Sequence, residues 1–128
     1  GTTVWSPLSR GELVGHYLEE KGGKFVVSKQ GNAWLKEAGL PPGYEARVKQ
    51  VAAFACIARE LEITPARLAL AWVLKNSNVT TAILGASNTN HLKENLKAIG
   101  DVSLLTNAVM GQIESIFQTS PVPEETFR

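Results

Sequence analysis

The stretch TTAILGASNTNHLKEN, residues 80–95, decides the fold because a strand-like run passes directly into a helical pattern. Residues 80–85 are mostly apolar without polar alternation, which is typical of a strand buried on both faces of a parallel sheet. Asn88 can cap the following helix, and Gly100 is placed to end it. The predicted buried stripe of this helix consists of Leu92, Leu96 and Ile99. Helices flank the strand in the sequence, so we expect parallel strands joined by helical crossovers.

A second strand is predicted at residues 2–5. This TTVW run is β-branched and aromatic, and Ser6 and Pro7 stop it because proline has no N–H group for a β-ladder. Residues 9–43 are dense in glycine and include two consecutive prolines. That composition favours a long excursion loop with one short helix near residues 13–18.

Three further helices surround the two strands in the sequence. Apolar residues recur with helical periodicity from Tyr44 onward and predict one amphipathic face, formed by Val48, Val51, Phe54, Ala55, Ala58 and Leu61. Thr64 can cap a second helix that has Pro65 at its first position. This helix is apolar almost all round, so it must be covered on several sides. Thr106 can cap a last helix, whose predicted inward face is Val109, Ile113, Ile116 and Phe117.

The composition is that of one soluble globular domain or a piece of one, with 44% hydrophobic and 20% charged residues. The formal net charge is +1 and no basic block is present, so nothing favours nucleic acid or a membrane surface as a partner. A single cysteine, Cys56, excludes an internal disulfide and suits a reducing compartment, and we expect a small buried side chain there. No apolar run approaches the roughly 20 residues of a membrane span, and no targeting signal is recognised.

Two parallel strands do not make a stable sheet alone, so the chain is predicted to be part of a larger α/β fold. In α/β barrels, sites form at the carboxyl ends of the strands, and phosphates bind there against helix N-termini. Gly85 allows close backbone approach, Ser87 adds a hydroxyl, and the helix beginning near Asn88 directs N–H groups outward. This junction is suited to an anion. The alternative, that Gly85 only permits a turn and Asn88 only caps, stays open.

Other polar and aromatic side chains near these strand ends have two interpretations each. His91 is a candidate for a proton-dependent phosphate contact or an ordinary surface histidine. Trp5 is a candidate to stack on a flat ring or a buried core residue. Glu94 and Asn95 by default belong to a solvated helical face. No nucleophile with a neighbouring base, no pair of acids and no metal cluster can be assembled, so no catalytic and no metal-binding residues are predicted.

Four segments together resemble the aldo-keto reductases, most closely the voltage-gated potassium channel β-subunit branch. They are WSPLSRGELVGHY (5–17), WLKEAG (34–39), LEITPARLALAWVLKNSNVTTAILGASNTNHLKENLKAI (61–99) and the ending ETFR. Members of this family are (β/α)8 barrels, a TIM-barrel fold, that bind NADPH. The resemblance implies that residues 2–5 and 81–85 are the seventh and eighth strands. Residues 1–128 would then be the C-terminal portion of a single barrel domain, incomplete on its own.

The resemblance also implies which residues hold the cofactor, when its motifs are carried over by position. The nicotinamide and pyrophosphate side would be lined by Trp5, Ser6, Pro7, Leu8 and Arg10. The adenosine and its 2′-phosphate would be surrounded by Gly85, Ser87, His91, Glu94 and Asn95. Two positions depart from the branch: His16 stands where a lysine is usual, and His91 where the family commonly has arginine or glutamine.

The family's catalytic Asp, Tyr, Lys and His lie in its N-terminal half, and neither Tyr17 nor Tyr44 occupies a matching position. The resemblance therefore implies the cofactor-binding part of a cytoplasmic NADPH-dependent oxidoreductase that reduces aldehydes or ketones by hydride transfer. The alternatives are a regulatory potassium-channel β subunit that binds NADPH and contacts a channel's cytoplasmic domain, or an inactive fragment. For each of these three functions, the expected partner of the chain is the N-terminal part of the barrel or further copies of the chain.

Overall fold

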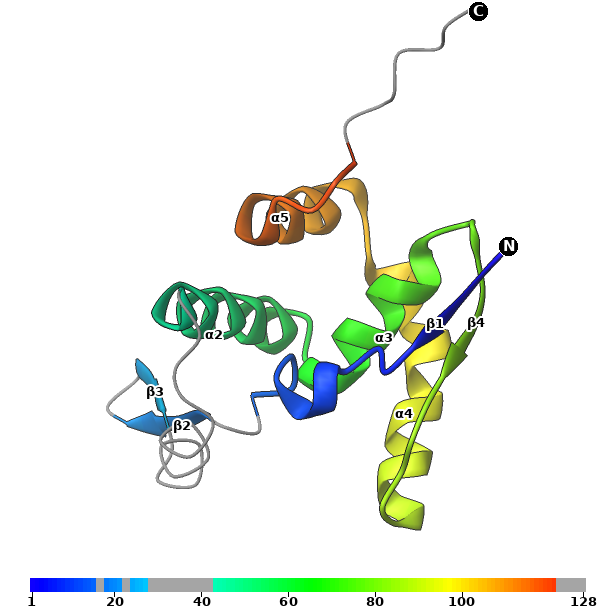
Figure 1. The fold of residues 1–128 in the computed structure, drawn as a ribbon, viewed down its shortest axis with the longest axis horizontal. Helices are drawn as coiled ribbons and strands as arrows, with labels where there is room; N and C mark the ends of the chain where they lie inside the picture. Colours follow the sequence, from blue (N-terminus) through cyan, green and yellow to red (C-terminus); the bar gives the residue numbers. More distant parts are fainter. Residues whose placement is uncertain (16–17, 22–23, 28–42, 122–128) are drawn as a thin grey trace, which may run out of the picture.

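The computed structural model describes residues 1–15, 18–21, 24–27 and 43–121 (Figure 1). A pair of parallel strands and four helices carry the architecture of the described residues, with two 3-10 turns and a hairpin beside them. In chain order the elements are β1 (Thr2–Trp5), η1 (Ser9–Gly11), β2 (Leu18–Lys21), β3 (Lys24–Val27), α2 (Tyr44–Glu60), α3 (Pro65–Lys75), β4 (Val79–Ile83), α4 (Thr89–Asp101), η2 (Val102–Leu104) and α5 (Asn107–Phe117).

Strands β1 and β4 pair in parallel, with Thr2 opposite Val79 and Trp5 opposite Ile83. The chain between them passes through α2 and α3, and α3 packs against both β4 and α4. Figure 1 shows β1 and β4 side by side, with α2 and α5 on the other side of α3. Both predicted strands, the helical crossover and the α/β class are confirmed, and the described residues form only part of such a fold.

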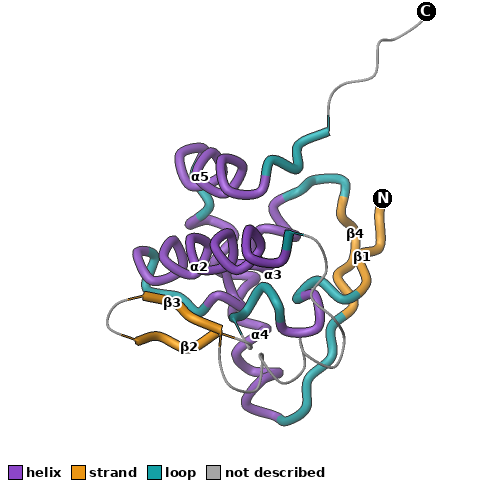
Figure 2. The backbone as a smooth tube through the Cα atoms, turned by 60° about the vertical axis from the view of Figure 1, so that its left-hand side comes forward, coloured by secondary structure: helices purple, strands orange, loops and turns teal. Residues whose placement is uncertain are grey.

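The prediction of a long loop with one short helix for residues 9–43 was wrong in two respects within the described residues, and residues 28–42 lie outside them. Residues 13–15 form a turn instead of a helix, and Leu18 begins β2. Strand β2 pairs in antiparallel fashion with β3, with Leu18 opposite Val27 and Lys21 opposite Lys24 (Figure 2). A Gly-Gly dipeptide between two short runs is a known hairpin signal, and the high glycine density of the region concealed it. His16, Tyr17 and residues 34–39 lie outside the described residues.

The core lies between α2, α3 and α5. Phe54, Leu68, Leu105 and Ile113 are fully buried there. The Trp72 and Phe117 rings stack with centroids 5.4 Å apart, and Phe54 meets the edge of Phe117 at 5.5 Å. The inward faces predicted for α2 and α5 are confirmed. Their half-buried members are Val48, Leu61, Val109, Ile116 and Phe117. The predicted cover of α3 on several sides is also confirmed, because Leu68, Ala69, Leu70 and Ala71 are buried in succession.

The stripe predicted for α4 is wrong. Its leucines and isoleucine are exposed, with Leu92 at 45%, Leu96 at 53% and Ile99 at 66%. The helix instead turns Asn95, Ala98 and Asp101 toward α3, where Asp101 pairs with an arginine. Gly100 lies within α4 and does not end it.

Two further burial predictions were wrong. Strand β4 is not covered on both faces, since a two-stranded sheet leaves Ile83 48% exposed. Cys56 is exposed as well. It lies two residues after the buried Phe54, which places it about 200° around α2 from the core-facing side. No helix in the described part of the chain is long and apolar enough to cross a membrane.

Candidate functional site

The carboxyl ends of β1 and β4 lie at the same edge of the sheet. The strands are parallel, and the last residues of each, Trp5 and Ile83, are opposite one another. The segment that follows β1 and the segment that follows β4 therefore begin side by side. These segments contain the two groups of residues that the sequence resemblance assigned to one cofactor.

At the end of β1 the backbone turns sharply. Ser6 has a left-handed conformation with φ 54°, which is uncommon for a residue other than glycine, and its carbonyl accepts a hydrogen bond from Ser9 N at 2.9 Å. Pro7 is buried and Leu8 packs against the core. Trp5 is 74% exposed, so in this chain it is not the buried core residue considered above. Arg10 lies in η1, and its side chain is outside the described part.

At the end of β4 the junction has the predicted cap. The Asn88 side-chain oxygen Oδ1 accepts a hydrogen bond from His91 N at 2.9 Å, and the Asn88 backbone carbonyl accepts one from Leu92 N at 3.2 Å. A hydrogen bond of 2.9 Å joins Ser87 Oγ and His91 Nδ1. The opening N–H groups of an α-helix have no intrahelical acceptor, so this end can bind an anion.

Gly85 lies beside open space. It is not in the left-handed region, and a Cβ atom built there would meet nothing within 4 Å. Neither the local turn nor the packing of the described residues therefore requires glycine at this position. The space leaves room for a ligand to approach the backbone.

Glu94 belongs to a charge network between α4 and α3. Lys97 Nζ donates to Glu94 Oε2 at 2.9 Å, and Thr64 Oγ1 donates to Oε1 at 3.3 Å. Arg67 donates twice to Asp101, from Nε to Oδ2 and from Nη2 to Oδ1, both at 2.6 Å. The hydrogen bond from Lys97 lowers the pKa of Glu94 most, and the bond to Asp101 raises the pKa of Arg67.

The solvated helical face suggested for Glu94 and Asn95 does not hold for Asn95, which is only 7% exposed. Sequence reasoning missed Arg67 and Asp101. They are far apart in the sequence, and the only signal was an arginine inside an otherwise apolar helix.

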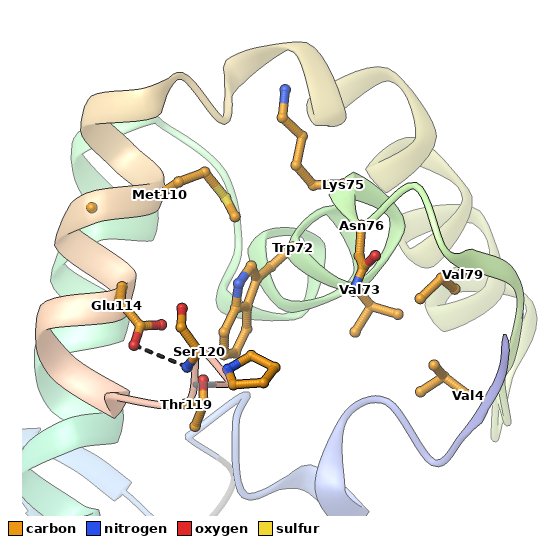
Figure 3. Close-up of a pocket in the computed structure, with 12 residues that line it drawn as sticks. Val4, Trp72, Val73, Lys75, Asn76, Val79, Met110, Glu114, Thr119 and Ser120 are labelled. Carbon is orange, nitrogen blue, oxygen red and sulfur yellow. Dashed lines mark hydrogen bonds between the residues drawn. The ribbon is translucent and has the colours of Figure 1, made fainter. Parts of the chain in front are cut away.

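A separate pocket of about 640 Å³ lies between β1, α3, α5 and the segment after α5 (Figure 3). Trp72 and Met110 point into it, and Ser120 N donates to Glu114 Oε1 at 3.0 Å at its border. Val79, the first residue of β4, and Val4 of β1 also line it. The described residues of the segments 5–10 and 85–95 contribute nothing to its lining. Among the described residues there is no cluster of three or more His, Cys, Asp or Glu side chains that could hold a metal.

Comparison with known proteins identifies one family and several relatives with similar names. The model of the Aldo/keto reductase family matches residues 1–118. The whole chain is 35% identical to a "Probable voltage-gated potassium channel subunit beta" of Arabidopsis thaliana and covers 38% of that protein. The identity is 36% over 95% of the chain with a "Putative voltage-gated potassium channel subunit beta" of Schizosaccharomyces pombe, of which 35% is covered. A similarly named protein of Oryza sativa is 35% identical over the whole chain, with 38% covered. The chain thus spans little more than a third of the length of these relatives.

Proposed function

This chain belongs to the aldo/keto reductase family, and from that premise we propose that it is the C-terminal, NADPH-binding part of a reductase of aldehydes or ketones. Residues 1–128 would complete a single barrel domain with a longer N-terminal part. One observation supports this most: the parallel register of β1 and β4, with Trp5 opposite Ile83. This register brings the segments 5–10 and 85–95 to one edge of the sheet. Such proximity is required if the two segments bind opposite ends of one extended cofactor.

The segment after β1 would hold the nicotinamide and pyrophosphate. Trp5 presents an exposed indole on which a flat ring can stack. The left-handed Ser6 turns the chain away from the strand, and the buried Pro7 anchors the turn. Leu8 and Arg10 follow on the same short segment. These residues would bind and orient the cofactor, which supplies a hydride when it is bound.

The segment after β4 would hold the adenosine and its 2′-phosphate. The hydroxyl of Ser87, the ring of His91 and the start of α4 offer hydrogen bonds to a phosphate group. Open space beside Gly85 fits a ligand that lies against the backbone. Glu94 and Asn95 stand about one turn further into α4. Asn95 is turned toward α3, so in this chain Glu94, with its side chain 31% exposed, is the one of the two that an adenosine could reach.

Reduction of a carbonyl also needs a proton donor for the oxygen atom. No residue of this chain is assigned that role by the motifs. We therefore expect the general acid to lie in the N-terminal part of the protein. A variant of this chain can weaken cofactor binding without removing the acid.

The first test is a fluorescence titration with NADPH, on this chain and on the full polypeptide that carries it. We expect saturable binding by the full polypeptide. Gly85→Val, which would fill the open space, should weaken it by about ten-fold or more, the equivalent of at least one lost hydrogen bond. Gly111→Val is the matched control, because Gly111 also has open space around it, on α5. Failure of the full polypeptide to bind NADPH would contradict the proposal.

Binding by the isolated chain would indicate that these loops keep their geometry without the rest of the barrel. Binding by the full polypeptide alone would place essential parts of the site elsewhere and leave this chain inactive by itself. The two results distinguish a cofactor-sensing fragment from an incomplete one.

A second candidate function is regulation of a potassium channel, favoured by the names of the relatives. In this case the full polypeptide would bind NADPH in the cytoplasm and contact a channel's cytoplasmic domain. NADPH-dependent reduction of an aldehyde favours the first candidate. A change in channel current without carbonyl turnover favours the second.

A further inference from the structure

The contact between α3 and α4 contains an ion pair of close geometry. Arg67, in the first turn of α3, donates from Nε and Nη2 to the two oxygens of Asp101, both at 2.6 Å. The Asp101 side chain is only 8% exposed and stands at the last residue of α4. Two parallel bonds of this kind fix the relative orientation of the guanidinium and the carboxylate as well as their separation.

The same arginine reaches a second point on α4. Its Nη1 lies 3.9 Å from Glu94 Oε1, which also accepts from Thr64 Oγ1 at 3.3 Å. Thr64 in turn caps α3 by accepting from Arg67 N at 3.3 Å. Glu94 and Asp101 lie about two turns apart on one face of α4. The first turn of α3 therefore holds α4 at two places along its length.

Two fixed points on one face set the rotation of α4 about its own axis. Asn95, Ala98 and Asp101 are the buried residues of α4, whereas Leu92, Leu96 and Ile99 are exposed. This rotation is the one that brings both Asp101 and Glu94 within reach of Arg67.

We propose that Arg67 is a positioning residue for cofactor binding: by holding Asp101 and Glu94 it fixes the rotation of α4, and so the direction in which the partly exposed Glu94 is presented. This inference rests on the proposed function, because that function places the adenosine against Glu94. Arg67 itself would not touch the cofactor. It would act through Glu94 and through the helix.

The decisive variant is Arg67→Met combined with Asp101→Leu. Arg67→Met alone leaves a buried carboxylate unpaired, which destabilises a protein, whereas replacing both partners of a buried pair by apolar residues is often neutral or stabilising. We expect the double variant of the full polypeptide to unfold at the same urea concentration as the wild type and to bind NADPH about ten-fold more weakly, the equivalent of one lost hydrogen bond. Wild-type affinity in this stable double variant would overturn the proposal.

A second measurement reports the rotation without any cofactor. In the isolated chain with a Cys56→Ser background, Asn95→Cys should react slowly with a thiol reagent and Leu96→Cys quickly, because the first position is buried and the second exposed. Adding Arg67→Met and Asp101→Leu should bring the two rates together. An unchanged ratio would overturn the proposal even if NADPH binds normally. Changed labelling with no NADPH binding in the wild type would support the rotation and contradict the proposed function.

Single-site variants complete the comparison. Ile113→Val on α5 removes one buried methylene and is the control for a loss of stability alone, so it should leave NADPH affinity unchanged. Arg67→Lys keeps the charge without the two-pronged geometry and should weaken binding less than the double variant. An equal loss of affinity in Ile113→Val would show that general destabilisation explains the effect, and would overturn the proposal.

Discussion

The two halves of the molecule differ in how they bury their apolar residues. The three-helix core, formed by α2, α3 and α5, closes over Phe54, Leu68 and Ile113 with its own side chains. The open flank, formed by β1, β4 and α4, leaves large apolar side chains exposed. These are Trp5, Ile83, Leu92, Leu96 and Ile99.

This difference shows which part of the chain can be stable by itself. Helices bury their apolar faces against one another, whereas a parallel sheet needs neighbours at both edges and cover on both faces. The open flank has neither within the described residues. Exposed apolar patches of this kind usually mark an interface, and in the barrel proposed above an N-terminal part would cover this flank.

The largest effect is expected in the three-helix core. Phe54→Ala removes a fully buried ring that contacts Trp72 and Phe117, and should lower the free energy of unfolding by about 3–5 kcal/mol. Urea denaturation followed by circular dichroism measures this loss. Leu96→Ala in the open flank is the control. A loss below about 1 kcal/mol for Phe54→Ala would contradict the contrast between the two halves.

Helix caps allow a sharper comparison, because each half has one of similar geometry. Thr106 caps α5 and Asn88 caps α4, through bonds of 3.3 Å and 2.9 Å. Alanine at either position should remove about 1 kcal/mol. Hydrogen exchange should show that Thr106→Ala lowers the protection of backbone amides throughout the three-helix core. The Asn88→Ala loss should be confined to α4, and equal loss everywhere would mean that the two halves unfold as one unit.

A smaller effect concerns pH and Glu94. The pKa of this carboxyl is lowered mainly by the hydrogen bond from Lys97, so its charged form is favoured in the folded state. The stabilisation is complete above the unfolded pKa of about 4.3 and is lost as the pH falls below it through the folded pKa. We expect the urea midpoint of the wild type to fall more than that of Glu94→Gln when the pH is lowered from about 6 to about 3. The control is Glu60→Gln on the exposed end of α2, and identical pH profiles for wild type and Glu94→Gln would contradict the prediction.

The smallest effect on stability is expected for Leu96→Ser in the open flank. Its side chain is 53% exposed, so in the isolated chain the change should stay within about 0.5 kcal/mol. We expect the isolated wild-type chain to self-associate, and Leu96→Ser to reduce this in sedimentation velocity runs. A wild-type chain that is monomeric and well folded in dilute solution would contradict the interface assigned to this flank.

Local sequence signals determined most of the secondary structure. Helical periodicity located α2, the Thr64 cap and Pro65 located α3, and the capping residues Thr64, Asn88 and Thr106 all have the predicted bonds. Such caps join residues three positions apart, so the neighbouring sequence is enough to specify them. The family motifs identified the candidate cofactor residues in the same way, and the structure adds that the two segments share one edge. The hairpin β2–β3 also had a local signal, which the surrounding glycines concealed.

Only the tertiary structure decided which sides of the elements are buried. The apolar stripe of α4 predicted one buried face, but the helix buries Asn95, Ala98 and Asp101 instead, and Asp101 pairs with Arg67 of α3. Cys56 and Ile83 are exposed because burial depends on which elements pack against a surface. Periodicity shows that a residue can be buried, since it reports the order of side chains along one element. It does not show what covers that residue, because the covering element comes from a distant part of the sequence.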